Sequence, residues 1–167
     1  TGLILIILSP SLAFAEQIGK VVLTQGNPIV ERNNHHIFIK RNDLLFTGDT
    51  LITPLGTKIL FRLNDESTIS LAENTEFVLS RYRYKRKSSD VSFKMLKGAF
   101  RALSGRIGKQ KNPQFEVHTP IATIGIRGTE FWGGMIFSNA LDVTMLSGKG
   151  IYIKNKYGKV NINQSGL

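Results

Sequence analysis

The side chains that could take part in binding are mainly cationic, and the densest group of them is Arg81-Tyr-Arg-Tyr-Lys-Arg-Lys87. The 167 residues carry 22 Lys and Arg against 12 Asp and Glu, which gives a formal net charge of +10. Side chains alternate between the two faces of a strand. The segment is therefore predicted to form a basic ribbon whose cations share one face: Arg81, Arg83, Lys85 and Lys87. Tyr82, Tyr84 and Arg86 would lie on the other face.

Two interpretations of this basic ribbon stay open. It could bind an anionic envelope glycan, a lipid head group or an acidic protein, which are the polyanions that a basic exported protein meets before any nucleic acid. It could instead be a solvated edge strand, because positive charge on an edge prevents pairing with other chains. The Gly-rich loop 104–113 adds three more candidate binding residues, Arg106, Lys109 and Lys111. We expect no nucleic-acid partner.

Arg127 stands at a corner between two apolar, β-favouring segments, directly before Gly128. A guanidinium is planar and suits carboxylate and phosphate groups, so Arg127 could bind an anionic ligand. The sequence favours a structural role instead, in which Arg127 bonds nearby carbonyl groups or pairs with Glu130 or Asp142, since arginines in tight corners are usually paired or packed.

Residue types with catalytic or metal-binding chemistry do not form a recognisable group. The chain has no cysteine and three histidines. His35 and His36 are adjacent in a turn and would point to opposite faces of a strand, and His118 is expected to be a packed, hydrogen-bonded residue. Aspartates fall near turns, where they commonly bond their own backbone. We therefore expect no enzyme, no metal site and no cofactor.

Short alternating apolar segments, separated by glycine corners, fill the chain from Ile18 onward. Examples are Ile59, Phe61 and Leu63, and Val91, Phe93 and Met95. No window keeps the i, i+3, i+4, i+7 apolar pattern of a helix. The sequence therefore predicts an all-β domain. Frequent turns favour a solenoid-like stack of short strands, and a β-sandwich is the alternative.

Residues 1–15 form an uncharged apolar segment that ends in Ala13-Phe-Ala15, the small-residue pattern of a signal peptidase site. The apolar run is shorter than the roughly 20 residues that cross a bilayer. We predict a signal peptide over 1–15, a single domain over 16–167, export to the periplasm or beyond, and no stable membrane span after cleavage. The alternative is that the segment is the second half of a membrane anchor.

Several sequence blocks, in order, resemble those of the FecR domain. They are Leu44 to Thr53, Leu63 to Ser67, Leu96 to Phe100, Val117 to Pro120 and Ile126 to Phe131. The family-motif residues among them are Gly48, Asp49, Thr119, Pro120, Arg127, Gly128 and Thr129. The resemblance implies an extracytoplasmic β domain.

Full-length relatives of this type span the inner membrane, hold an ECF sigma factor through a cytoplasmic N-terminal region, and receive a signal from a TonB-dependent transducer. This sequence opens on the apolar segment and ends at Leu167, and we therefore expect a free-standing exported domain without the cytoplasmic region and the transducer-contacting subdomain of those relatives. The expected function is thus a non-catalytic periplasmic binding or signal-relay module that contacts a protein or an anionic envelope component. The alternative is a membrane-anchored anti-sigma regulator whose cytoplasmic N-terminal part is missing from the sequence.

Overall fold

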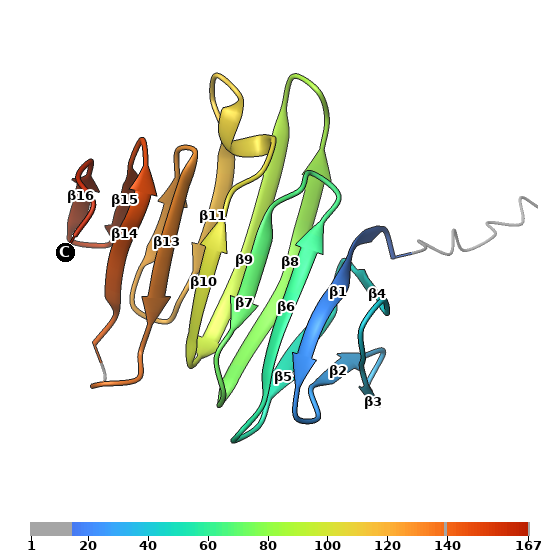
Figure 1. Ribbon diagram of the computed structural model, residues 1–167. Helices are drawn as coiled ribbons and strands as arrows, with labels where there is room; N and C mark the ends of the chain where they lie inside the picture. The colour runs from blue at the N-terminus through green and yellow to red at the C-terminus, as the bar shows by residue number, and fades with distance from the viewer. Residues whose placement is uncertain (1–14, 139, 167) are drawn as a thin grey trace, which may run out of the picture.

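The computed structural model describes residues 15–138 and 140–166, and these residues build an all-β fold (Figure 1). Within this part of the chain, seven strands form one sheet in the order β14-β13-β10-β7-β6-β1-β4. Their bounds are β1 (Gln17–Gln25), β4 (Leu44–Phe46), β6 (Lys58–Leu63), β7 (Thr68–Leu71), β10 (Ala99–Leu103), β13 (Thr129–Gly134) and β14 (Asp142–Gly148). The predicted fold class is confirmed, whereas the predicted signal peptide lies outside the described residues except for Ala15.

The second sheet has nine strands in the described residues, in the order β16-β15-β12-β11-β9-β8-β5-β2-β3. Their bounds are β2 (Ile29–Arg32), β3 (His35–Phe38), β5 (Thr50–Thr53), β8 (Thr75–Tyr84), β9 (Ser89–Lys97), β11 (Gln114–His118), β12 (Thr123–Ile126), β15 (Ile151–Asn155) and β16 (Gly158–Ile162). Neighbours in this sheet are antiparallel except β9 and β11, which are parallel.

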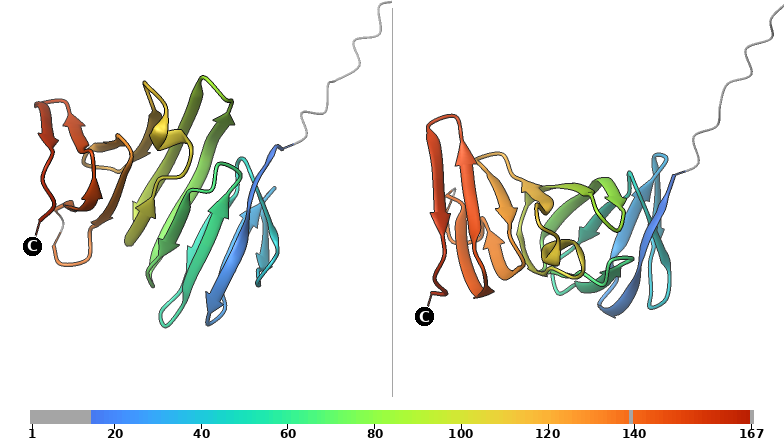
Figure 2. Two further views of the ribbon diagram at one scale, coloured as in Figure 1. Left: turned by 45° about the horizontal axis from the view of Figure 1, so that its top comes forward. Right: turned by 90° about the horizontal axis from the view of Figure 1, so that it is seen from above.

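The two sheets face each other as two layers, and the chain advances from one end of them to the other (Figure 2). It passes from the nine-stranded to the seven-stranded sheet at Gly98 and again at Gly128, whose φ values are 89° and 68°. Such values lie in the left-handed region, which glycine enters without steric cost. This arrangement agrees with the β-sandwich alternative. The solenoid-like stack is not confirmed. Frequent turns in the sequence do not predict which strands pair, because pairing depends on contacts between distant segments.

Buried phenylalanines from both sheets fill the space between the layers. Phe77 of β8 contacts Phe93 of β9 and also Phe61 and Phe100 of the facing sheet, with ring centroids 5.5–6.5 Å apart. Phe115 and Phe131 extend this cluster toward the C-terminal end. Tilted and edge-on pairs of this kind each contribute roughly 0.5–1.5 kcal/mol beyond the burial of their area. The core therefore rests on the period-two alternation seen in the sequence.

Helical structure in the described residues is restricted to one 3-10 turn, η1 (Ile107–Lys109), inside the basic loop 104–113. Residues 15–138 and 140–166 accordingly contain no helix with the length and apolar character needed to span a bilayer.

Candidate anion-binding cleft

The predicted basic ribbon is only partly a strand. Arg81 and Arg83 lie exposed on β8 while Tyr82 is buried, so the predicted alternation holds as far as Tyr84. Lys85 and Lys87 lie beyond the strand, in the β8–β9 turn.

The basic ribbon contacts an acidic residue, and it does not lie on a sheet edge. Asp90 pairs with Arg81 at 2.8 Å and with Arg83 at 3.8 Å, which reduces the positive charge of this face. The edge-strand interpretation is wrong, because β8 lies between β5 and β9.

Asp65 fastens the basic loop 104–113 to the body of the domain. Its buried carboxylate accepts hydrogen bonds from the Ser67 hydroxyl (2.6 Å), the Tyr82 hydroxyl (3.1 Å) and the backbone N–H of Ile107 (3.2 Å). Gly105 N–H in turn donates to Ser67 Oγ at 2.8 Å. Burial, together with the nearby Asp65 charge, raises the pKa of Tyr82 well above the ordinary value of 10.0. These hydrogen bonds hold the basic loop in a fixed position.

Three glycines bring three loops, one of them the basic loop, into backbone contact. Gly108 belongs to the basic loop, Gly128 to the β12–β13 corner, and Gly148 ends strand β14 at the start of the β14–β15 turn. A Cβ on Gly128 would lie 2.6 Å from the carbonyl oxygen of Gly108, and one on Gly148 would overlap the carbonyl oxygen of Gly128. Because any larger residue would force these loops apart, the glycines set the separation of the side chains that the loops carry.

Thr129 also holds these loops together, through hydrogen bonds of its backbone and its side chain. Its hydroxyl donates to the Gly150 carbonyl at 2.6 Å and accepts from the Gly150 N–H at 3.2 Å. Its own N–H donates to Ser104 Oγ at 2.9 Å. Thr129 is therefore a structural residue that ties the β12–β13 corner to both neighbouring loops.

Beside this junction lies an open cleft of about 700 Å³. Each of the three loops contributes one cation to its lining, and β16 contributes a fourth: Lys111, Arg127, Lys149 and Lys159. Within the described residues, no acidic side chain lines the cleft and none of the four cations forms an ion pair. The cleft is thus suited to a ligand with more than one negative charge.

Arg127 does not have the structural role that the sequence favoured. Glu130, its expected partner, instead accepts a 2.9 Å hydrogen bond from Arg101 Nε. In the described part of the chain no ion pair or hydrogen bond joins Arg127 to Asp142, and the Arg127 guanidinium makes no hydrogen bond. The expectation was wrong because Arg101 lies opposite Trp132 on the neighbouring strand, within reach of Glu130.

Tyr152 forms an aromatic part of the lining. Its ring lies over Gly125, where a Cβ would collide with it, and Lys159 Nζ lies 4.3 Å from the ring centroid. Its hydroxyl donates to Glu116 at 2.5 Å. Burial, followed by this hydrogen bond and the charge of Glu116, raises the pKa of Tyr152 above 10.0, so the phenol stays neutral. Arg and Lys contacts to a ligand here would be supported by a flat apolar surface.

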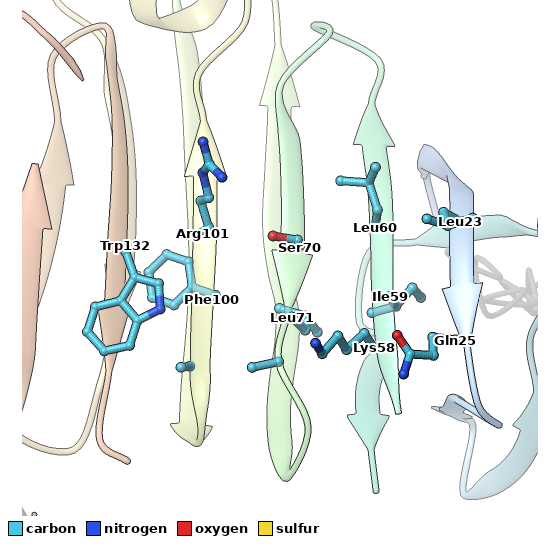
Figure 3. Close-up of a pocket in the computed structure, with 12 residues that line it drawn as sticks. Leu23, Gln25, Lys58, Ile59, Leu60, Ser70, Leu71, Phe100, Arg101 and Trp132 are labelled. Atoms are coloured by element: carbon cyan, nitrogen blue, oxygen red, sulfur yellow. The ribbon is translucent and has the colours of Figure 1, made fainter. Parts of the chain in front are cut away.

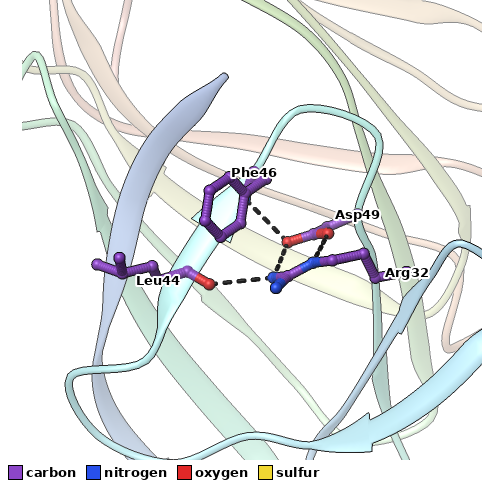
Figure 4. Close-up of polar contacts among 4 residues, drawn as sticks. All are labelled: Arg32, Leu44, Phe46 and Asp49. Carbon is purple, nitrogen blue, oxygen red and sulfur yellow. Dashed lines mark hydrogen bonds and ion pairs between the residues drawn. The ribbon is translucent and has the colours of Figure 1, made fainter. Parts of the chain in front are cut away.

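The other family-motif residues have structural roles. Asp49 is fully buried and holds Arg32 through two contacts of 2.7 Å, while it accepts the Phe46 N–H at 2.9 Å (Figure 4). Gly48 precedes it with a φ of 93°.

The second motif corner, at Thr119 and Pro120, is a turn closed by a side chain. The Thr119 hydroxyl accepts the N–H groups of Ile121 and Ala122 at 3.2 and 3.1 Å. As expected, His118 is hydrogen-bonded, with Nδ1 2.9 Å from Thr123 Oγ1. In the described ranges no three His, Asp or Glu side chains group as metal ligands would.

Of the predicted binding residues, the structure brings only Lys111 into the cleft. Arg106 pairs with Glu66 at 2.6 Å, and Lys109 is exposed at the end of η1 but does not line the cleft. Sequence reasoning missed Lys149, Tyr152 and Lys159. The Gly148-Lys-Gly150 sequence was a signal for the first of these, since a lysine between two glycines sits on a tight turn.

Comparison with known proteins agrees with the motif residues. A family model described as FecR protein matches residues 49–149, a range that contains Asp49, Thr119, Pro120, Arg127, Gly128 and Thr129. Searches of the curated proteins and of the solved structures gave no match. The matched family is a regulatory and not an enzymatic one, and it is associated with the cell envelope. Since the match covers more than half of the sequence, the chain belongs to the FecR family.

Proposed function

We propose that this protein is a non-catalytic, exported signal-relay module that binds an anionic group of a protein or of an envelope component in the cleft beside Arg127. The observation that carries the proposal is the convergence of Lys111, Arg127, Lys149 and Lys159 on one cleft without an acidic neighbour in the described residues. Keeping like charges close together opposes folding unless a ligand neutralises them. Such an arrangement is typical of a binding site.

The proposed signal relay depends on the loops that carry these cations. Lys111, Arg127 and Lys149 belong to three different loops that meet at the glycine junction. A ligand that bonds all three would hold these loops together and restrict their movement. The loops connect strands of both sheets, so a partner could sense whether the cleft is occupied through the order of this end of the sandwich.

Binding through the cleft can be separated from binding through the basic ribbon by matched charge reversals. One variant combines Arg127→Glu with Lys149→Glu, and its control combines Arg81→Glu with Arg83→Glu, so that both change the net charge equally. Inorganic tripolyphosphate serves as a defined probe in an NMR titration, and solubilised envelope fractions serve in a pull-down. We expect the first variant to weaken tripolyphosphate binding by about 100-fold, because each lost charge-assisted hydrogen bond weakens binding about tenfold.

The control variant is expected to bind tripolyphosphate within about threefold of the wild type, and raising the salt concentration should weaken wild-type binding because exposed charges are screened. An equal loss in the two variants would mean that only overall charge matters, and the cleft would no longer be the proposed site. Greater loss in the control variant would return the site to the ribbon.

Export is part of the proposal and is supported by the apolar segment 1–15. N-terminal sequencing of the protein recovered from the periplasm or the medium is expected to begin at Glu16. Recovery of the uncleaved chain from the membrane fraction would oppose it.

A second candidate function, favoured by the family match over residues 49–149, is a membrane-anchored anti-sigma regulator. Its cytoplasmic part would be encoded ahead of Thr1. The two candidates differ in one readout: a sigma-dependent reporter responds to deletion of a regulator and does not respond to deletion of a free exported module.

A further inference from the structure

The outer face of the seven-stranded sheet carries an apolar trough that lies apart from the cleft (Figure 3). Five outward-facing residues form a row of direct cross-strand neighbours: Leu23, Leu60, Ser70, Arg101 and Trp132. The trough has a volume of about 460 Å³ and a mainly apolar lining. Leu23 at one end of the row is 60% exposed, although leucine is usually buried.

The trough follows strand β7, because the outward side chains there are small. Ser70 and Ala72 lie between Leu60 on β6 and Trp132 on β13. From β6 to β13, the strands that carry Leu60 and Trp132, there are three strand spacings, about 14 Å, and Thr68 to Ala72 covers about 14 Å along the strand. An α-helix is about 10 Å in diameter and needs about nine residues for 14 Å. The hollow is thus wide enough to hold one helix.

The charges around the trough are mainly positive. Lys58, Arg62 and Lys20 stand on the same outer face, exposed, and none of them forms an ion pair within the described residues. Arg101 is the exception, because it is neutralised by Glu130. An occupant with acidic groups on the flank facing β1 and β6 would be favoured electrostatically.

This charge pattern distinguishes among the possible occupants. A second copy would bring the same cations face to face, which opposes docking. The segment 1–15 is apolar but carries no acidic residue that could pair with the cations beside the trough. A β-strand pairs at a sheet edge and not on a face, and a single acyl chain is narrower than a helix and would leave the trough partly empty.

We propose that the outer face of the seven-stranded sheet binds an amphipathic helix of a partner protein, whose apolar stripe lies along β7 against Leu60 and Trp132 and whose acidic flank faces Lys58, Arg62 and Lys20. Covering one face of an antiparallel sheet with a helix is a common way to bury an apolar sheet face. This site is separate from the anion-binding cleft, so the domain would have two contact surfaces.

Trp132 makes the proposal directly measurable, because it is the only tryptophan in the sequence. The probes are two synthetic helical peptides of about 14 residues with the same leucine stripe, one flanked by Glu and the other by Lys. The acidic peptide is expected to shift Trp132 emission to the blue in a saturable manner and to bind at least about tenfold more tightly than the basic one.

Two variants test the position and the charge of the site. Ser70→Phe fills the floor of the trough on an exposed face. It is expected to weaken binding of the acidic peptide at least about tenfold without loss of folding. Lys58→Glu with Arg62→Glu is expected to reverse the preference toward the basic peptide. The control combines Arg81→Glu with Arg83→Glu, which carries the same change in net charge at residues that line neither the trough nor the cleft, and it should leave the preference unchanged.

Three results would overturn the proposal. The first is equal binding of the two peptides, or binding that Ser70→Phe leaves unaltered. The second is a blue shift that follows protein concentration alone, which would indicate a second copy as the occupant. The third is a shift produced by phosphatidylglycerol vesicles and by neither peptide, which would indicate a lipid surface.

Discussion

Two glycine corners of this domain each lie beside an arginine, and the surroundings of the two arginines are opposite. At the Gly48-Asp49 corner, Arg32 is held by two contacts with Asp49, donates to the Leu44 carbonyl at 3.1 Å, and lies 4.5 Å from the centroid of the Phe46 ring. At the Gly128-Thr129 corner, the side chain of Arg127 is exposed and, within the described residues, forms no hydrogen bond and no ion pair. One corner uses its arginine to close the fold, whereas the other presents its arginine to a cleft.

The difference shows that a motif residue's role depends on where its neighbours' hydrogen bonds go. The hydrogen bond with Asp49 raises the pKa of Arg32 further above its already high value, so its charge is permanently committed to that carboxylate. At the second corner Thr129 and the glycines satisfy the backbone, and Arg127 is left free for a ligand. Substitutions at the two corners should therefore affect different properties.

The largest effect is expected for Asp49→Ala, which removes the partner of Arg32 and leaves the Phe46 N–H unbonded. Arg32 is 29% exposed, so the loss is placed at the lower end of the range for a broken buried pair, about 3 kcal/mol of the free energy of unfolding. Urea denaturation followed by Trp132 fluorescence measures it. Asp142→Ala, at an exposed aspartate, is the control and should change stability by less than about 0.5 kcal/mol. Similar losses in both variants would contradict a structural role for the Arg32–Asp49 pair.

A second comparison uses the glycines of the two corners, Gly48→Ala and Gly128→Ala. Both residues have positive φ, and an alanine there costs about 1 kcal/mol of stability from backbone strain alone. Apart from its chain neighbours, Gly48 has no atom of the described residues within 4 Å of a new Cβ, whereas at Gly128 the Gly108 carbonyl oxygen lies 2.6 Å away. We expect Gly128→Ala to lose about 2 kcal/mol in total and to weaken tripolyphosphate binding.

Thermal or urea unfolding of the two glycine variants supplies the measurement, with tripolyphosphate titration as the second readout. Equal losses of stability and unchanged binding in Gly128→Ala would mean that the contact with Gly108 does not set the shape of the cleft.

A third prediction concerns the support under the second corner, the Asp65–Tyr82 contact. Tyrosine is neutral while protonated, and the pKa of Tyr82 in the fold is raised, so the folded protein keeps this proton at a pH where the unfolded chain loses it. The stabilisation is complete below about pH 10 and is lost as the pH rises further. Tyr82→Phe should cost about 1 kcal/mol at neutral pH and reduce the decline in stability above pH 10.

Tyr152 also has a raised pKa, so part of the alkaline decline should persist in Tyr82→Phe and disappear when Tyr152→Phe is added. Urea midpoints measured from pH 8 to 11 test this, and an unchanged alkaline slope in the double variant would show that other groups cause the decline.

What the sequence predicted well was local. The alternation around Phe61 and Phe93 indicated which side chains are buried, and Gly128 before Thr129 indicated a corner, because both depend on residues within a few positions. The assembly of the cleft was not predictable in this way. Lys111, Lys149 and Lys159 meet only because β11, β12, β15 and β16 are neighbours in one sheet, and strand order depends on pairing between distant segments.

The partner of Arg127 was missed for a related reason. Glu130 is three residues away in sequence, but strand alternation and the register with β10 bring it to Arg101 instead. Sequence proximity favours a pair only when both side chains share a face, and residues on either side of a corner need not do so.

The smallest effect on stability, and the sharpest test of the two-corner comparison, is expected for Arg127→Ala. Because this guanidinium makes no hydrogen bond in the described residues, its removal should change the free energy of unfolding by less than about 0.5 kcal/mol. Tripolyphosphate binding should nevertheless fall about tenfold, and Arg127→Lys should recover only part of it, because lysine keeps the charge but not the planar fork. A large loss of stability with unchanged binding would place Arg127 in the same class as Arg32, and the distinction between the two corners would then disappear.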